Sequence, residues 1–175
     1  MSKSSSDKNN QDEKKILSEL VKNSKDNIDS IAKHCGFSRQ KTWRIIKKLE
    51  EKGMIWGYTA VFDEKKIGLI HFLLLIKRST TKTEEKDVDA IISRDVETLA
   101  AEYAITIENS AYIHGEYDWI ITFTAKDIRD AKNFSNKLIS IYSFSIEKIT
   151  IMQTLIFMRK NYILNPERNK LKEFM

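Results

Sequence analysis

The chain of 175 residues contains one cysteine, one proline and five glycines. A single cysteine excludes a disulfide scaffold and a zinc site built from a cysteine cluster, and it indicates a reducing compartment, so we expect a cytoplasmic protein. The scarcity of glycine and proline excludes collagen-like and low-complexity chains. The longest unbroken apolar run, Phe72–Ile76, is too short to cross a bilayer, so we expect no membrane partner.

The sequence also lacks the motifs of common enzyme and metal sites. It contains no Gly-x-Gly-x-x-Gly loop, no Gly-Lys-Ser/Thr phosphate loop and no pair of acids at hydrolase spacing. Its three histidines, His34, His71 and His114, stand far apart, without cysteine or carboxylate partners at metal-ligand spacing. We therefore expect no metal, no cofactor and no enzymatic activity.

The positive charge is concentrated in the first part of the chain. Residues 1–68 contain 15 basic and 10 acidic residues, whereas residues 69–175 contain 15 of each. The whole net charge of +5 therefore falls in the first part. Such asymmetry indicates a module that binds a polyanion, joined to a neutral module; an uneven scatter of lysine by chance is the alternative.

Three helices are predicted in this basic part. Apolar residues recur at helical spacing over residues 12–23, 28–35 and 38–52. Asn27 and Ser38 are suitable N-caps for the second and third helices, and Gly36 supplies the left-handed end of the second helix. Two short helices joined by a tight turn are typical of a helix-turn-helix.

The third helix has two opposed faces. Thr42, Ile45, Ile46 and Leu49 predict an inner apolar stripe. The opposite face carries basic and amide side chains, which can contact base edges and phosphates when a recognition helix enters the major groove. The predicted residues for binding double-stranded DNA are Ser38, Arg39, Gln40, Lys41, Trp43, Arg44, Lys47 and Lys48.

Trp43 lies in the middle of this outward face. An indole exposed to water leaves a large apolar surface unburied. The position of Trp43 therefore indicates an interface, either with DNA or with a partner subunit. Without such a partner, the segment is an ordinary three-helix domain with a solvated basic face.

The rest of the chain predicts a second domain of α+β class. Apolar and alternating runs predict strands over residues 69–77, 106–113, 117–125 and 146–158, with helices over residues 84–102 and 127–141. The order β-α-β-β-α-β is the ferredoxin-like arrangement, and one open sheet face predicts a dimer. We divide the chain into a disordered tail (1–11), a winged-helix-like helix-turn-helix domain (12–57), a strand linker (58–68), the ferredoxin-like domain (69–158) and a polar tail (159–175).

Together these features resemble the Lrp/AsnC (feast/famine) transcription regulators. The resemblance is carried by Ile31-Ala32, Gly36-Phe37-Ser38, Leu49-Glu50, Gly53-Met54-Ile55, Gly57-Tyr58, Gly115-Glu116-Tyr117-Asp118 and Thr154-Leu155-Ile156. It implies sequence-specific DNA binding, homodimers through the C-terminal sheet that assemble further into tetramers or octamers, and an amino-acid effector between sensor domains. The chain departs from the family pattern at Thr42, Ile45 and Met152.

The predicted effector site combines a loop with the last strand. Gly115 lets a ligand approach the backbone, Tyr117 offers a ring and a hydroxyl, and Asp118 can hold an ammonium group. The alternative is a hairpin turn in which the glycine is required for a positive φ and the aspartate caps the strand. The predicted effector residues are His114, Gly115, Tyr117, Asp118 and Thr154.

Two other functions remain open at this stage. Sirohaem decarboxylases resemble the same scaffold and use histidine and arginine as working groups. His71 and His114 can take this part if they approach each other across the sheet. A non-DNA protein-interaction module would use Trp43 as its anchor. The basic face of the third helix favours the DNA-binding regulator over both.

Overall fold

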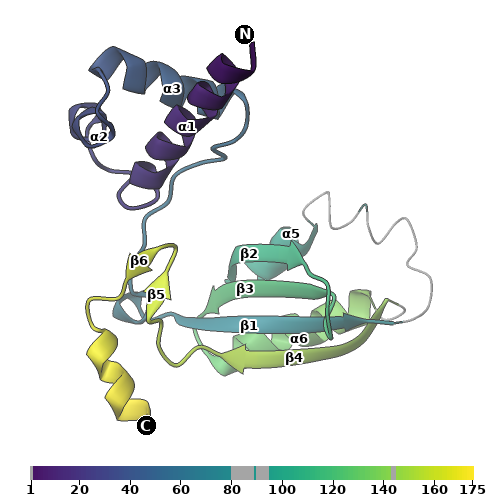
Figure 1. The fold of residues 1–175 in the computed structure, drawn as a ribbon. Coiled ribbons are helices and arrows are strands. Elements are labelled where there is room, and N and C mark those ends of the chain that lie inside the picture. Colours follow the sequence, from purple (N-terminus) through teal and green to yellow (C-terminus); the bar gives the residue numbers. More distant parts are fainter. Residues whose placement is uncertain (1, 80–88, 90–94, 143–144) are drawn as a thin grey trace. The chain divides into compact units, whose positions relative to one another are not determined.

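The computed structural model describes residues 2–79, 89, 95–142 and 145–175 (Figure 1). The chain divides into two compact units. The first contains residues 1–61 with most of residues 157–175, and the second contains residues 62–156. No described helix has both the length and the apolar character needed to cross a membrane.

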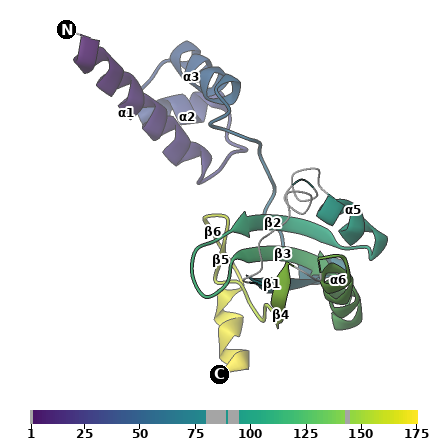
Figure 2. The ribbon, with the colours of Figure 1, turned by 90° about the vertical axis from the view of Figure 1, so that its right-hand side faces the viewer.

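Three helices form the core of the first unit: α1 (Ser2–Leu20), α2 (Ile28–Cys35) and α3 (Arg39–Glu51). Figure 2 shows them packed against one another. Asn27 caps α2, because its side-chain oxygen accepts from the Ser30 backbone N–H at 2.8 Å. Gly36 ends α2 with a φ of 69°, a left-handed conformation that glycine adopts without strain. The predicted caps and the helix-turn-helix are therefore confirmed.

Helix α1 is longer than the sequence predicts. It starts at Ser2, so the disordered tail that we expected over residues 1–11 is wrong for residues 2–11. The apolar stripe of residues 16–20 anchors the helix on the core, with Ile16 and Leu20 buried. Once such a nucleus exists, each added residue gains a backbone hydrogen bond without a new nucleation cost. Polar residues can therefore extend the helix beyond its packed part.

The linker between the helices and the sheet is not a strand. Residues 54–63 have no regular structure, and Glu64–Ile67 form a short 3-10 helix, η1, which ends at Gly68 with a φ of 76°. The predicted strand linker (58–68) is thus wrong. Strand propensity alone does not make a strand, since the backbone needs a neighbouring strand to pair with. Trp56 in this segment is 97% exposed.

The second unit is the expected ferredoxin-like sheet. Its strands stand in the order β2-β3-β1-β4, with each neighbouring pair antiparallel. This confirms the predicted α+β class. Residues 80–88 and 90–94, which hold most of the first predicted helix, lie outside the described residues. The elements are β1 (Ile70–Arg78), α5 (Asp95–Glu102), β2 (Thr106–Tyr112), β3 (Trp119–Ala125), α6 (Ile128–Ile141) and β4 (Ile146–Gln153).

The two faces of the sheet differ. Alternate residues of β1, namely Phe72, Leu74 and Ile76, are fully buried in the core with residues of α5 and α6. Both helices lie on this one face (Figure 2). On the other face, Leu73 and Leu75 are only half-buried and Met152 opposite Leu73 is exposed. The described part of this unit therefore leaves this sheet face, which also carries threonine and lysine side chains, largely open.

The end of the chain is more ordered than a polar tail. Strand β4 stops at Gln153, five residues before the predicted end at 158. Beyond it lie β5 (Arg159–Lys160), β6 (Ile163–Leu164) and the 3-10 helix η2 (Arg168–Phe174). Asn161 and Tyr162 both have positive φ, 43° and 69°, as a two-residue hairpin turn of type I′ requires. This turn pairs β5 with β6 in the segment that we predicted as a polar tail.

Candidate nucleic-acid interface

Helix α3 is anchored on one side. Its cap is Ser38, whose Oγ accepts from the Lys41 backbone N–H at 3.2 Å. Thr42 and Leu49 are fully buried, and Ile45 and Ile46 pack half-buried against the helical core. The predicted inner stripe is therefore confirmed. Because one face is fixed in the core, the opposite face is held rigidly toward the exterior.

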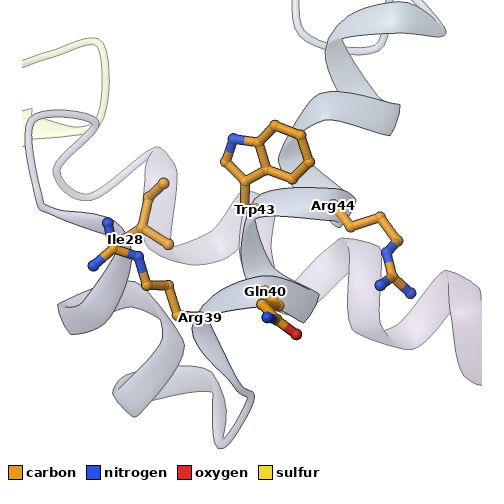
Figure 3. Close-up of a pocket in the computed structure, with 5 residues that line it drawn as sticks. All are labelled: Ile28, Arg39, Gln40, Trp43 and Arg44. Carbon is orange, nitrogen blue, oxygen red and sulfur yellow. The ribbon is translucent and has the colours of Figure 1, made fainter.

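The exposed side of α3 forms a shallow depression of about 540 Å³ together with α2. Figure 3 shows its lining side chains, with Trp43 standing out from α3 between Ile28 of α2 and Arg44. Trp43 is 53% exposed. The structure thus brings together four of the eight predicted DNA-binding residues. The lining residues are Ile28, Arg39, Gln40, Trp43 and Arg44.

Two of the cationic side chains near this depression form ion pairs with acidic side chains. The Arg39 guanidinium Nη1 lies 3.0 Å from Asp29 Oδ2, and the Lys47 Nζ lies 2.8 Å from Glu50 Oε2. The hydrogen bond from Lys47 holds the pKa of Glu50 below its usual value, and the same bond raises the pKa of Lys47. Arg44 has no acidic partner among residues whose structure is described. Of the two arginines that line the depression, it is therefore the one whose charge no described acidic side chain offsets.

Two other predicted DNA contacts lie on the flank of α3 that faces α1. Lys41 Nζ is 2.6 Å from Asp12, and Lys48 Nζ is 2.9 Å from Glu13. The hydrogen bond from Lys48 keeps the pKa of Glu13 below its usual value, although burial of the carboxylate opposes this shift. These lysines therefore join α3 to α1, a role that the sequence analysis missed because the acids stand far away along the chain.

Ile28 and Asp29 are two further residues at this surface that were not predicted from the sequence. Both belong to the first turn of α2, next to the exposed face of α3. The signal was available, since the Asn27 cap places these two residues at the start of the helix that precedes the turn.

The predicted effector loop mainly closes the sheet. Asp118 Oδ2 accepts from the Arg78 backbone N–H at 2.8 Å, and the Asp118 backbone N–H donates to the Ile76 carbonyl at 3.0 Å. His114 is exposed, and Tyr117 is half-buried. Gly115 has no positive φ, and a Cβ added there would meet no atom within 4 Å. The hairpin explanation of this glycine is therefore wrong, and its backbone stays open to approach.

Thr154 lies at the other end of the sheet. Its Oγ1 is 2.6 Å from Nδ1 of His71, which is 7% exposed and has its Nε2 3.3 Å from Glu108 Oε2. In the sheet register His71 pairs with Thr124, at the end of β3, whereas the loop precedes the start of β3. The five predicted effector residues do not form one site within a chain.

The same register separates His71 from His114. His71 lies near the start of β1, while His114 lies in the loop beside the other end of that strand. The premise of the decarboxylase alternative, that these histidines approach each other across the sheet, is wrong. Among the described residues, no group of three or more His, Cys, Asp or Glu side chains is placed to hold a metal ion.

Known proteins resemble the chain in both sequence and structure. Residues 13–55 match the family described as winged helix-turn-helix DNA-binding. The HTH-type transcriptional regulator PH0061 of Pyrococcus horikoshii is 32% identical over 126 residues, which cover 71% of this chain and 76% of that protein. An HTH-type transcriptional regulator of Pyrococcus abyssi is 29% identical over 155 residues, covering 88% of this chain and 97% of the relative.

Solved structures share the fold over most of the chain. The crystal structure of PH0061 has a TM-score of 0.64 at 24% identity and covers 85% of this chain and 93% of its own. An AsnC family regulator from Agrobacterium tumefaciens has a TM-score of 0.64 at 19% identity, with 89% and 96% covered. A transcriptional regulator from Neisseria meningitidis, in complex with L-methionine, has a TM-score of 0.64 at 16% identity, with 85% and 91% covered. The chain belongs to the Lrp/AsnC family of helix-turn-helix transcriptional regulators.

Proposed function

We propose that the protein is a regulator that binds double-stranded DNA by inserting α3 of each subunit into the major groove. The observation that carries this proposal is the two-sided character of α3. Thr42 and Leu49 fix one face in the core, while Gln40, Trp43 and Arg44 stand exposed on the other. Arginine and glutamine can bond to base edges, and an α-helix fits the groove width.

The predicted DNA contacts divide by position. Arg39, Gln40, Trp43 and Arg44 line the depression and contact base edges or sugars. Ser38, Lys41, Lys47 and Lys48 lie around it and contact phosphates. Lys41 and Lys48 also hold α1 through their ion pairs, so their substitution affects folding as well as binding.

The test uses full-length protein and fluorescence anisotropy with DNA fragments recovered from a genomic pool. Affinity should fall linearly with salt on logarithmic axes, with a slope of about −0.9 for each phosphate contacted. Arg44→Ala should weaken the recovered fragments more than random duplex of equal length. Absence of any salt-sensitive binding, together with capture of a protein partner that Trp43→Ala abolishes, would replace this proposal with the interaction module.

We also propose a homodimer that joins through the open face of the sheet and assembles further into tetramers or octamers. Leu73 and Leu75 on that face are half-buried within one chain, and a second copy would cover them. Two-fold symmetry then presents two recognition helices to half-sites about one helical turn apart. Sedimentation of Leu75→Glu should show a monomer; an unchanged oligomer would place the interface elsewhere.

We propose that an amino acid is the effector. We also propose that the protein acts as a regulator in the cytoplasm and does not catalyse a reaction. The complex of the Neisseria meningitidis regulator with L-methionine supports the ligand class. Residues His114, Gly115, Tyr117 and Asp118 can share a site with Thr154 only if two copies each supply one part, because a single chain separates them. Calorimetry with each of the 20 amino acids tests this, and Thr154→Val should weaken the binding observed. Binding or turnover of a tetrapyrrole would favour an enzyme instead.

A further inference from the structure

The exposed face of α3 carries an apolar patch inside a polar rim. Trp43 is 53% exposed, and Ile28, half-buried at the start of α2, lines the same depression. Figure 3 shows that the indole projects from the helix and that Ile28 stands beside it. The two side chains form a shelf from two different helices, which we name the Trp43–Ile28 shelf. Exposed apolar surface in a polar surround marks a site where another molecule contacts the protein.

The groups around the shelf indicate what that molecule offers. Gln40, one turn before Trp43, presents an amide that both donates and accepts, and Arg44 presents only donors. No hydrogen bond holds Gln40 or the indole N–H within the described ranges of the chain. Arg39, which lines the same depression, lies one turn before Trp43, and Lys47, a proposed phosphate contact, lies one turn after it. The shelf therefore lies next to groups proposed to contact bases and phosphates, where base edges stand when α3 enters the groove.

The edges of the base pairs contain one apolar group in the major groove, the 5-methyl of thymine. The paired adenine offers an N7 acceptor and an N6 donor, which match the two ends of a glutamine amide. We infer that the Trp43–Ile28 shelf contacts the methyl group of a thymine and that Gln40 forms hydrogen bonds with the paired adenine. Each half-site therefore requires an A·T pair at the position that faces the shelf. This inference rests on the proposed entry of α3 into the groove.

The size of the effect follows from the methyl group alone. Moving one methyl group from water into an apolar contact corresponds to a factor of about four in affinity. A dimer that reads two half-sites applies this factor twice, which makes about 15-fold for both thymines together. Such a loss is readily measured by anisotropy.

The experiment starts by selecting duplexes from a randomised pool with the full-length protein. In the enriched duplex, each thymine is then replaced in turn by uracil, which removes only the methyl group and keeps every hydrogen-bonding group. One position in each half-site should lose about fourfold in affinity. In Trp43→Ala, thymine and uracil at that position should bind equally well, and Ile28→Ala should reduce the difference in part.

Trp56→Ala is the matched control. Trp56 is the other exposed tryptophan of the first unit and lies in the linker, outside α3, so its loss should leave the thymine-to-uracil ratio unchanged. An enriched duplex in which no uracil substitution matters overturns this inference alone and leaves the DNA-binding function intact. A ratio that survives in Trp43→Ala also overturns it. Failure to enrich any duplex overturns the proposed function together with the inference.

Discussion

Replacement of Thr42 by valine should stabilise the helical unit. Thr42 is fully buried on the inner face of α3, and its Oγ1 has no hydrogen-bond partner among the described residues. A helical threonine can donate to the carbonyl four residues earlier, which has a second lone pair beside the one that accepts the helical N–H, but Thr42 Oγ1 makes no such bond to the Ser38 carbonyl. A buried hydroxyl without a partner costs about 1–3 kcal/mol. Valine keeps the shape and has a similar helix propensity.

We therefore expect Thr42→Val to raise the free energy of unfolding by about 1–2 kcal/mol. For a cooperative unit of about 60–100 residues, each kcal/mol corresponds to about 4–8 °C in Tm. Urea unfolding followed by far-ultraviolet circular dichroism measures the change, and an unaltered m-value shows that the same surface is exposed on unfolding.

Thr42→Ser is the control for this prediction. It keeps the hydroxyl and deletes a buried methyl group, so it should destabilise by about 1 kcal/mol. DNA affinity should stay unchanged in both variants, because the substituted side chain faces the core. If Thr42→Val destabilises the unit, the hydroxyl has a partner in solution, and the reasoning from its burial fails.

Three further predictions concern caps and charges. Asp29→Asn should free Arg39 and raise DNA affinity by up to about fivefold, since exposed ion pairs are worth about 0–1 kcal/mol; anisotropy measures this, with Asp130→Asn in the second unit as the charge-matched control. Asn27→Ala should destabilise by about 1 kcal/mol through loss of the α2 cap, measured by urea unfolding. Because folding lowers the pKa of Glu13, its ionised carboxylate stabilises the folded state at pH values above its unfolded pKa, near 4.5. This stabilisation is lost as the pH falls through the folded pKa. The urea midpoint of the wild type should therefore fall more steeply than that of Glu13→Gln on acidification below about pH 5, and parallel curves would contradict this.

Local signals predicted the helix-turn-helix well. The Asn27 and Ser38 caps and the Gly36 turn depend only on residues within one helical turn, so the sequence contains all the information that they require. The inner stripe through Thr42 and Leu49 was equally local. What periodicity could not show is that Thr42 Oγ1 has no hydrogen-bond partner in the described part of the chain, because that depends on atoms brought together by packing.

Features that depend on distant residues were the ones missed. The linker was predicted as a strand from its alternating residues, yet nothing described in the chain pairs with it. Asp12 and Glu13 of α1 form ion pairs with Lys41 and Lys48 of α3, which are far away along the chain. The C-terminal hairpin depends on a positive φ at Tyr162, a residue type that does not favour this conformation.

The predicted effector residues are a different case, since the predicted topology already separated them. In a β-α-β-β-α-β sheet, β3 and β4 are both antiparallel to β1, so they run in the same direction. Asp118 directly precedes β3 and Thr154 directly follows β4, so the two residues must lie at opposite ends of the sheet. No loop movement within one chain can bring the two together, because β1 lies between them along its whole length. A ligand that contacts both residues must therefore lie between two copies, and its binding must be coupled to their assembly.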